Sequence, residues 1–378
     1  MLKDLILKSY KAIKALVTRR ILIECDNIPY EFQNVPLKKI LNWIFVEASI
    51  LLKTAKPGGW PTHLQIEPTN LCNLRCSLCP VTEGMDRSSG NMDFDVFKKL
   101  IDEVGDYIFL IILWDWGEPF LNKAIYDMIR YAKIRNIKIV SSTNGHIFSA
   151  GDHAEKVVRS GLDSLIFALD GISQVTYEHY RKGGNINKIL SGIKRVVSAK
   201  RKLNSKKPFI NLRFIVMEHN EHEVPKLKDF AKSLGVDTFT LKTLNPYDEF
   251  ITEEKARSFI PKNPAFQRFK YDIILHSRIR RKQNPCKALW NNPIIHWDGK
   301  VSPCTFDPND VYTMGDITKD NFYTIWRGTP YLQLRSQFRK DYKKIKQCSG
   351  CSYAFEGGTL SVETILPPTF FNKTPISD

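Results

Sequence analysis

The stretch that decides the fold runs from position 67 to position 80 and reads Glu67-Pro-Thr-Asn-Leu-Cys72-Asn-Leu-Arg-Cys76-Ser-Leu-Cys79-Pro80. It follows a short apolar segment, His63 to Glu67, that has the length of a β-strand. Three thiolates spaced C-x3-C-x2-C can bind three irons of a [4Fe-4S] cluster and leave the fourth iron open to an outside ligand. A structural zinc site would need a fourth protein ligand, which the neighbouring sequence does not offer. The spacing therefore predicts an iron–sulfur cluster with an open iron.

From His63 onward, short apolar segments alternate with amphipathic segments, which is typical of βα units around a parallel sheet. The predicted strands are His63 to Glu67, Ile108 to Trp114, Ile137 to Ser141, Ser164 to Leu169, Ile210 to Val216 and Thr238 to Leu241. The predicted helices are Asp93 to Val104, Lys123 to Ile134, Ala154 to Gly161, Ile186 to Arg201 and Val224 to Leu234. Six βα repeats predict an α/β fold, a partial (β/α)6 TIM-like barrel, with site residues at the C-terminal ends of its strands.

The cysteine loop strongly resembles that of the radical S-adenosylmethionine (radical SAM) superfamily, and the resemblance continues strand by strand to about residue 245. In that family the open iron binds the amino and carboxylate groups of SAM. One electron from the cluster then cleaves SAM to methionine and a 5′-deoxyadenosyl radical. The resemblance implies that Cys72, Cys76 and Cys79 are the catalytic cluster ligands.

Two motifs after the second and third predicted strands extend the resemblance. Trp116-Gly117-Glu118-Pro119 is similar to the family's motif for the methionine amino group, although Trp116 replaces its usual first glycine. The resemblance implies that Glu118 accepts a hydrogen bond from the SAM ammonium. Ser142-Thr143-Asn144-Gly145 is similar to another family signature that lines the SAM site, so we expect Asn144 beside SAM.

Asp170 and Arg181 complete the implied SAM site. Ala168-Leu-Asp170-Gly resembles the family's Ser-x-Asp-Gly, and Arg181 follows at about the distance of an arginine that pairs with the SAM carboxylate. Because Ala168 lacks the usual hydroxyl, ribose or carboxylate contacts are expected to rest on Asp170 and Arg181. Taken singly, Glu118 could be a charge at a helix N-terminus and Asp170 a turn former. The implied cofactor-binding residues are Gly117, Glu118, Pro119, Asn144, Asp170 and Arg181.

Four further cysteines lie near the C-terminus. Cys286, Cys304, Cys348 and Cys351, with Gly299 between the first two, resemble the SPASM/Twitch extension of radical SAM enzymes, which binds auxiliary clusters. Four thiolates suffice for one closed auxiliary [4Fe-4S] cluster. A zinc ion held by the same four cysteines is the alternative, because spacing alone does not separate the two metals.

The sequence predicts four regions: residues 1–60 as an N-terminal helical segment, 61–246 as the radical SAM core, 247–285 as a basic linker with helical character, and 286–378 as a small C-terminal iron–sulfur domain. The first region has apolar residues at helical spacing with lysines between them and no clear strand pattern. We expect its helices to pack against the core. A basic amphipathic helix can instead lie on a membrane surface, so peripheral membrane contact is the alternative.

The composition is that of a globular protein: of 378 residues, 43% are hydrophobic and 25% charged. Apolar segments are too short for a membrane span and the N-terminus lacks a signal-peptide pattern, so we expect a cytoplasmic protein. Lys and Arg number 56 against 40 Asp and Glu, a net charge of +16. The positive charge is dense from Lys255 to Lys287, which favours an acidic electron donor of the flavodoxin or ferredoxin type.

The resemblance implies a radical SAM oxidoreductase that abstracts hydrogen from a substrate. Seven cysteines are assigned to clusters, and Cys25 is expected to be a buried small hydrophobic residue rather than a hydrogen donor. An auxiliary cluster could accept an electron, so net oxidation of a small, anionic or sugar-like substrate is favoured. The alternatives are maturation of a ribosomally made peptide, epimerisation of a sugar and, remotely, a zinc-dependent nucleic-acid-binding protein.

Overall fold

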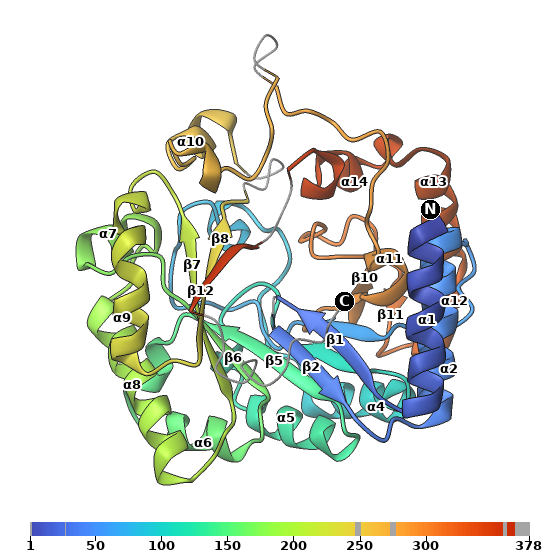
Figure 1. Cartoon of the computed structure of the whole chain (residues 1–378), viewed down its shortest axis with the longest axis horizontal. Helices are drawn as coiled ribbons and strands as arrows, with labels where there is room; N and C mark the ends of the chain where they lie inside the picture. Colours follow the sequence, from blue (N-terminus) through green and yellow to red (C-terminus); the bar gives the residue numbers. More distant parts are fainter. Residues whose placement is uncertain (1, 27, 246–250, 273–276, 358–360, 367–378) are drawn as a thin grey trace.

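A mixed sheet forms the centre of the molecule (Figure 1). The computed structural model describes residues 2–26, 28–245, 251–272, 277–357 and 361–366. The strand order is β11-β10-β9-β3-β4-β5-β6-β7-β8-β12. The strands of this sheet are β3 (His63–Ile66), β4 (Leu110–Ile112), β5 (Lys138–Thr143), β6 (Ser164–Ala168), β7 (Phe209–Val216), β8 (Thr238–Thr243), β9 (Ile294–Ile295), β10 (Lys300–Ser302), β11 (Gly315–Asp316) and β12 (Ser361–Leu366).

Strands β3 to β8 each pair in parallel with the next strand and form the partial barrel that the sequence predicts. All six predicted strands are present, and their bounds shift by a few residues. The largest difference is at β4, which ends at Ile112, two residues before the predicted end at Trp114. Residues 113–118 turn away from the ladder there and enter the candidate site, so tertiary position shortens an otherwise apolar strand.

Helices cover the outer face of the barrel (Figure 1). Three of them begin at a residue whose side chain accepts a backbone N–H of the first turn: Asp93 for α4, Ser173 for α7 and Asn185 for α8. The barrel helices are α3 (Pro80–Glu83), α4 (Phe94–Val104), α5 (Ile125–Ile134), α6 (His153–Arg159), α7 (Gln174–Tyr180), α8 (Ile186–Lys202) and α9 (Leu227–Leu234). Short 3-10 turns between them are η1 (Pro119–Leu121), η2 (His146–Ser149) and η3 (Glu221–Lys226).

The N-terminal segment contains two helices, as predicted, and a β-hairpin that the sequence reasoning missed. Helices α1 (Leu2–Thr18) and α2 (Leu37–Leu52) flank strands β1 (Ile21–Cys25) and β2 (Ile28–Phe32), which pair antiparallel. The signal was short: apolar residues alternate at Ile28, Tyr30 and Phe32, whereas Leu22 interrupts the alternation between Ile21 and Ile23. Two five-residue segments next to a strong helical pattern were insufficient to identify it.

The hairpin packs on the inner face of the barrel sheet. Its buried side chains form one cluster with Leu110, Val140 and Ile166 of three neighbouring strands, and Phe32 meets Phe109 edge-on at 5.0 Å between ring centroids. The adjacent strand positions belong instead to the core under the outer helices. Since side chains alternate across a strand, the hairpin and the helices lie on opposite faces. The hairpin therefore fills the inside of the open barrel.

The C-terminal region continues the core sheet. Strand β9 pairs in parallel with β3, with Gln65 opposite Ile294, and β10 and β11 follow antiparallel. Its helices are α11 (Ala288–Asn291), α12 (Phe322–Arg327), α13 (Thr329–Asp341) and α14 (Lys346–Gly350), with 3-10 turns η5 (Tyr342–Lys344) and η6 (Ser352–Ala354). The buried Trp326 indole donates to the Gly59 carbonyl at 3.0 Å, so this region packs directly on the core.

The linker is less helical than predicted. Its described residues contain only α10 (Glu253–Arg257) and the 3-10 turn η4 (Pro264–Phe266). The expectation of a helical linker is therefore wrong for most of this stretch. Pro261, Pro264 and Pro285 lack the backbone N–H that a helix interior needs, which accounts for the interruption.

Candidate active site

A cavity of about 870 Å³ lies between the two cysteine groups. Cys79 lines it on the barrel side, and all four C-terminal cysteines line it on the other. The barrel contributes residues at the C-terminal ends of its strands, where sites in such folds are found. Cys79 of the first cysteine group and all four cysteines of the second thus face one partly open space.

The first cysteine group lies on the loop between β3 and α3. Leu78 has a left-handed backbone with φ of 64°, and Cys79 immediately precedes α3. Burial raises the pKa of the Cys72 thiol to about 11 and that of Cys79 to about 12. Buried thiols of this kind ionise only when a cation compensates the charge, so the three side chains suit a bound metal cluster.

Gly117 brings the end of β4 against this loop. Its φ is +86°, and a Cβ placed on it would lie 2.6 Å from the Thr69 carbonyl oxygen. The next backbone N–H, that of Glu118, donates to the Leu71 carbonyl at 2.8 Å. Only glycine allows both the backbone conformation and this close approach. Gly117 therefore fixes the cysteine loop to the barrel as well as lining the cavity.

Glu118 is buried and joins three segments. Its Oε1 accepts from the Thr143 hydroxyl at 2.7 Å, and its Oε2 accepts from the Asn144 backbone N–H at 2.7 Å. Burial raises the pKa of Glu118 to about 7, against the lowering effect of these donors. Asn144 in turn donates from Nδ2 to the Asn73 side chain at 2.7 Å, within the cysteine loop. Pro119 is buried and begins η1.

Asp170 and Arg181 form a buried ion pair. Asp170 Oδ2 lies 2.7 Å from both Arg181 Nε and Nη2, and its Oδ1 accepts from the Ile215 backbone at 2.8 Å. The other Arg181 nitrogen, Nη1, points to Cys76 Sγ at 3.9 Å. Arg181 lines the cavity, whereas Asp170 is fully buried behind it. The geometry makes Asp170 a residue that orients Arg181.

The second cysteine group is assembled from three segments. Cys286 precedes α11, Cys304 follows β10, and Cys348 and Cys351 lie in and just after α14. Burial raises the pKa of every one of these thiols, and repulsion from Cys348 and Cys286 raises that of Cys304 further. The four thiols stay protonated unless a cationic group compensates the repulsion between their thiolates, so this donor set fits a metal centre as well.

The spacing of the sulfurs favours clusters over single ions. Among the described residues, the only group of at least three His, Cys, Asp or Glu ligand atoms within 4.8 Å of one another is formed by Glu67, Asp115 and His296. Four sulfurs around one zinc, at Zn–S bonds of about 2.3 Å, would lie roughly 4 Å apart. Neither cysteine group is that compact, and a larger iron–sulfur cluster suits both better.

Asp115 is a site residue that the sequence reasoning missed. It lies three residues after the end of β4 and lines the cavity, and its Oδ1 accepts from Gln65 at 2.8 Å and from Thr305 at 2.6 Å. Its Oδ2 is buried and has no hydrogen-bond partner among the described residues. Its position directly after the predicted strand, one residue before the Trp116 motif, was the available signal.

A buried charge network surrounds Asp115. Glu67 receives a bidentate pair of bonds from Arg87 at 3.0 and 2.7 Å, and His296 Nε2 lies 2.8 Å from Asp310. Despite burial, the carboxylates of Asp310 and Glu67 raise the pKa of His296 to about 10. The positive charges of Arg87 and His296 thus balance the negative charges of Glu67 and Asp310. This balance does not include Asp115. Burial and the Glu67 charge raise the pKa of Asp115 to about 7.

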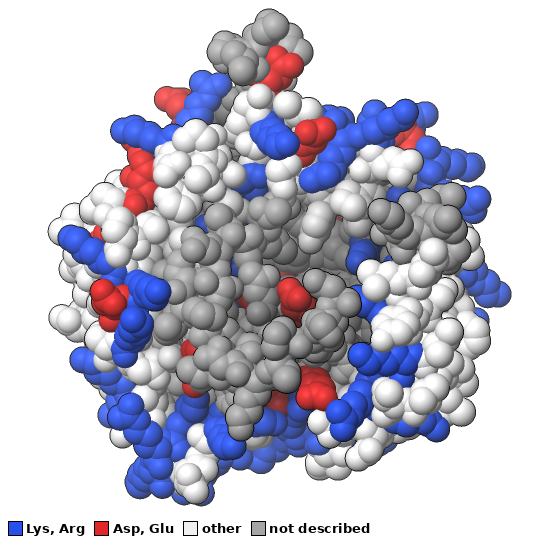
Figure 2. Space-filling view, in the orientation of Figure 1, with Lys and Arg blue, Asp and Glu red and all other residues white. Residues whose placement is uncertain are grey.

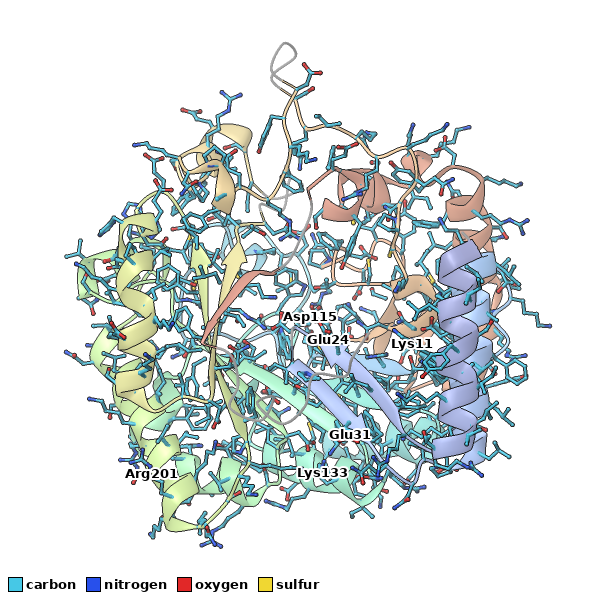
Figure 3. The ribbon with its side chains drawn as sticks, viewed as in Figure 1. Lys11, Glu24, Glu31, Asp115, Lys133 and Arg201 are labelled. Carbon is cyan, nitrogen blue, oxygen red and sulfur yellow. The ribbon has the colours of Figure 1, made fainter. Side chains whose placement is uncertain are left out.

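Cys25, which the sequence predicts to be a buried small hydrophobic residue, also lines the cavity. The hairpin places Cys25 on the cavity wall with Glu24 and Asp26, and Figure 3 shows Glu24 and Asp115 near the centre of the molecule. Cys25 is partly exposed there, and burial raises the pKa of its thiol to about 11. Asp26 pairs with Arg213 and Lys242 of β7 and β8. Because the sequence analysis did not predict the hairpin, it also did not place the Cys25 thiol at the site.

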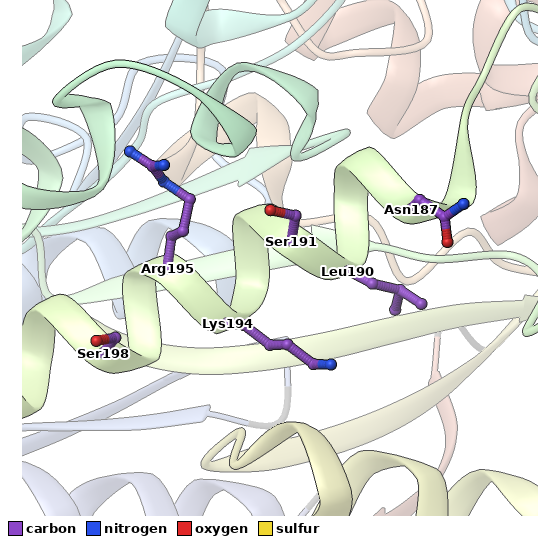
Figure 4. Close-up of a pocket in the computed structure, with 6 residues that line it drawn as sticks. All are labelled: Asn187, Leu190, Ser191, Lys194, Arg195 and Ser198. Carbon is purple, nitrogen blue, oxygen red and sulfur yellow. The ribbon is translucent and has the colours of Figure 1, made fainter.

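Another hollow lies on the outer surface of α8 (Figure 4). Its lining comes from one helix and includes no cysteine or carboxylate; the residues are Asn187, Leu190, Ser191, Lys194, Arg195 and Ser198. It has no group suited to redox or acid–base chemistry, so the candidate site is the cavity between the cysteine groups.

Comparison with protein families assigns both parts of the chain. Residues 66–231 match the radical SAM superfamily, and residues 286–352 match SPASM, an iron–sulfur cluster-binding domain. The chain is 30% identical over 333 residues to the AdoMet-dependent heme synthase of Nitratidesulfovibrio vulgaris, covering 78% of this chain and 86% of that protein. It is 25% identical over 323 residues to the tungsten-containing aldehyde ferredoxin oxidoreductase cofactor-modifying protein of Pyrococcus furiosus, covering 77% and 87%.

Solved structures share the fold. Streptococcus suis SuiB bound to S-adenosylmethionine superposes with a TM-score of 0.57 at 16% identity, over 88% of this chain and 78% of that one. BtrN in complex with AdoMet and 2-DOIA gives a TM-score of 0.51 at 16% identity, over 81% and 98%. The chain belongs to the radical SAM superfamily and carries a C-terminal SPASM domain. Its cofactors are [4Fe-4S] clusters and SAM. No helix in the described residues is long and apolar enough to cross a membrane.

Proposed function

We propose that this protein is a radical SAM oxidoreductase that removes hydrogen from a small, anionic or sugar-like substrate bound between its two cysteine groups. The observation that carries the proposal is the shared cavity, whose volume of about 870 Å³ suits a small molecule. When bound, the cluster and SAM supply the radical that abstracts a hydrogen atom from the substrate. The chain's own residues then determine how the substrate radical is resolved.

Cys72, Cys76 and Cys79 would hold the SAM-binding cluster, and Cys286, Cys304, Cys348 and Cys351 the auxiliary one. On the barrel side, Arg181 presents a cation beside Cys76, suited to the SAM carboxylate, and Asp170 holds its guanidinium in place. Glu118 and Asn144 connect the SAM side of the cavity to the cysteine loop. These contacts support the SAM-binding roles that the family resemblance implies.

Net oxidation needs a proton acceptor. A substrate with an O–H or N–H beside the reacting carbon gives up one hydrogen atom, one electron and one proton when it becomes C=O or C=N. Among the carboxylates that line the cavity, Asp26 is paired with two cations and Glu24 is exposed. Asp115 has a buried, unpartnered Oδ2. We assign the proton to this oxygen, and the electron would pass to the auxiliary cluster that Cys286, Cys304, Cys348 and Cys351 would hold.

The cavity wall also supports the substrate class. Three cations, Arg213, Lys242 and Arg268, line the cavity together with the carboxylates of Asp26 and Glu24, so the formal charge of these five side chains is +1. Burial lowers the pKa of Arg213 to about 10, so its charge is held in a poorly solvated position. A carboxylate or phosphate on the substrate would compensate this charge.

Return of a hydrogen atom to the substrate radical is the second candidate reaction, because Cys25 lines the same cavity. Its raised pKa keeps the thiol protonated at neutral pH, and only a protonated thiol can donate a hydrogen atom. Such a donor would restore the substrate's oxidation level and yield an epimer. Peptide modification is a further alternative, because the chain is 22% identical over 277 residues to the subtilosin biosynthesis protein AlbA.

The test measures 5′-deoxyadenosine formed by the reconstituted, dithionite-reduced protein with sugar phosphates, aminocyclitols and short peptides in turn. Stimulation above the substrate-free rate by a sugar phosphate or aminocyclitol, with a product two electrons more oxidised, is the expected result. Solvent deuterium in a product at the substrate's oxidation level, lost in Cys25→Ala, would replace oxidation by epimerisation. Stimulation by peptides alone would contradict the small-molecule proposal.

The electron donor is proposed to be an acidic flavodoxin or ferredoxin in the cytoplasm. The support is the basic stretch from Lys255 to Lys287, whose exposed cations include Lys282 and Lys287. Charge of this kind accelerates encounter with an acidic partner.

A further inference from the structure

Helix α1 has its apolar stripe on the outside. Four side chains spaced by four, three and four residues share one face of this helix. They are exposed to 60% for Ile6, 60% for Tyr10, 61% for Ile13 and 77% for Val17. A helix that packs on a globular core normally turns such a stripe inward.

The helix contacts the rest of the chain through other residues. Ala15 is buried to 2% exposure in the hairpin cluster, and Lys8 pairs with Glu47 of α2 at 3.2 Å. Small and polar side chains therefore make the intramolecular contact. The apolar stripe remains uncovered by the described residues, although burying one such side chain is worth about 1.5–3 kcal/mol.

Helix α2 repeats this arrangement. Leu37, Leu41, Phe45 and Leu52 are spaced for one helical face and are all exposed. The buried residues of α2, such as Ile40 and Val46, lie on its other side. Two antiparallel neighbouring elements of the N-terminal segment thus both present apolar side chains outward, and exposed patches of this kind mark contact surfaces.

The charges beside the α1 stripe identify the partner. Lys11 and Lys14 are exposed on α1, Arg20 is exposed just after it, and Asp4 is the only acidic residue in the sequence from position 1 to position 20. Figure 2 shows uncharged surface bordered by Lys and Arg in the region of α1, and Figure 3 labels Lys11 there. Apolar side chains flanked by lysines match the acyl and headgroup layers of an anionic membrane.

We propose that α1 and α2 form a membrane-docking surface for anionic lipids, so that the enzyme binds peripherally without spanning the bilayer. The proposal is independent of the reaction assigned above. Ile6, Tyr10, Ile13 and Val17 enter the interface, while Lys11 and Lys14 lie at the level of the lipid phosphates. A second protein copy would use the same apolar stripe but would not require the lysines.

The test is co-sedimentation of the full-length protein with vesicles of phosphatidylcholine alone or of phosphatidylcholine with phosphatidylglycerol. Binding is expected only to the anionic vesicles and should weaken as salt is raised. Ile13→Glu/Val17→Glu should reduce binding by roughly 100-fold or more, because two apolar contacts are lost. Lys11→Glu/Lys14→Glu should reduce it by roughly 30-fold, at about 1 kcal/mol for each lysine near the surface.

The matched control is Ile134→Glu/Val175→Glu, which places the same charges at apolar side chains on other helices that are more exposed, to 77% and 84%. This variant should bind like the wild type, and circular dichroism should show that all variants fold. Equal vesicle binding by Ile13→Glu/Val17→Glu and wild type would overturn the proposal. A wild-type dimer in light scattering that becomes monomeric in Ile13→Glu/Val17→Glu, without vesicle binding, would also overturn it and assign the surface to a second copy.

Discussion

The two cysteine groups of this protein differ in how the chain assembles them. Cys72, Cys76 and Cys79 lie on one loop, and the ends of neighbouring strands supply polar groups around them, such as Arg181. The auxiliary cysteines come from separate segments spanning residues 286–351 and meet only in the folded domain. The first group leaves an iron open for SAM, and the second can close its cluster with four thiolates. Local sequence spacing therefore determines the first cysteine group, whereas tertiary packing brings the auxiliary cysteines together.

The largest expected effect separates the two groups by function. Cys76→Ala should abolish SAM cleavage by dithionite-reduced protein, because the three-thiolate site loses its geometry. Cys348→Ala/Cys351→Ala should retain substrate-free cleavage. Chromatographic measurement of 5′-deoxyadenosine checks both, with Cys25→Ala as the control that keeps cleavage. Equal cleavage by Cys76→Ala and wild type would contradict the assignment of the first group.

Iron analysis distinguishes the two groups by composition. Wild-type protein reconstituted without oxygen should contain about eight irons, and Cys72→Ala/Cys76→Ala/Cys79→Ala about four. The remaining four belong to the closed auxiliary site. One zinc with only four irons in the wild type would show that the auxiliary cysteines hold zinc instead.

Gly117→Ala tests whether close backbone contact holds the first group in place. The substitution should destabilise the protein by about 2 kcal/mol or more, because φ of +86° is strained for alanine and its Cβ meets the Thr69 carbonyl. Gly183→Ala is the matched control: its φ is +77°, but no atom lies within 4 Å of the added Cβ. Urea unfolding of both variants separates the effect of the Cβ contact from the effect of backbone strain. Equal losses in the free energy of unfolding would show that the contact with Thr69 contributes nothing.

Asp115→Asn tests the connection between the two groups. Reduction adds negative charge to the auxiliary cluster, which raises the pKa of a nearby carboxyl, so reduction should draw a proton onto Asp115. The wild-type midpoint potential should therefore fall as pH rises above about 7, by at most about 59 mV per tenfold change in proton concentration. In Asp115→Asn it should stay near the acidic wild-type value.

Redox titration followed by electron paramagnetic resonance measures this dependence. Glu24→Gln removes another carboxylate that lines the cavity and should leave the pH dependence unchanged, because Glu24 is exposed. The same pH dependence in Asp115→Asn and wild type would exclude Asp115 as the coupled proton acceptor.

The smallest expected effect concerns electron delivery to the clusters. Reduction by an acidic ferredoxin or flavodoxin should slow by roughly tenfold between low salt and about 1 M salt, as charge steering is screened. Lys282→Glu/Lys287→Glu should slow it at low salt, whereas Lys226→Glu/Lys228→Glu, elsewhere on the surface, should not. Stopped-flow absorbance checks the rates, and equal rates for the two variants would remove the basic stretch from the donor site.

Sequence reasoning succeeded where the signal was local. The C-x3-C-x2-C loop and six apolar strands predicted the superfamily and the barrel, because metal spacing and strand periodicity depend on neighbouring residues. The sequence analysis did not predict the hairpin and therefore did not place Cys25 at the cavity. The sequence pattern of two short strands does not differ from other brief apolar alternations. The hairpin is explained only by the fold, in which it buries Leu110 and Ile166 on the inner face of the sheet.

The sequence by itself therefore determined the class of enzyme, its cofactors and the order of its barrel strands. Only the tertiary structure decided that both cysteine groups face one cavity, that Asp115 keeps an unpartnered oxygen there, and that α1 turns its apolar stripe outward. The physical reason is distance along the chain. Spacing within a motif is set by covalent geometry, whereas burial, charge balance and exposure depend on residues that meet only after folding.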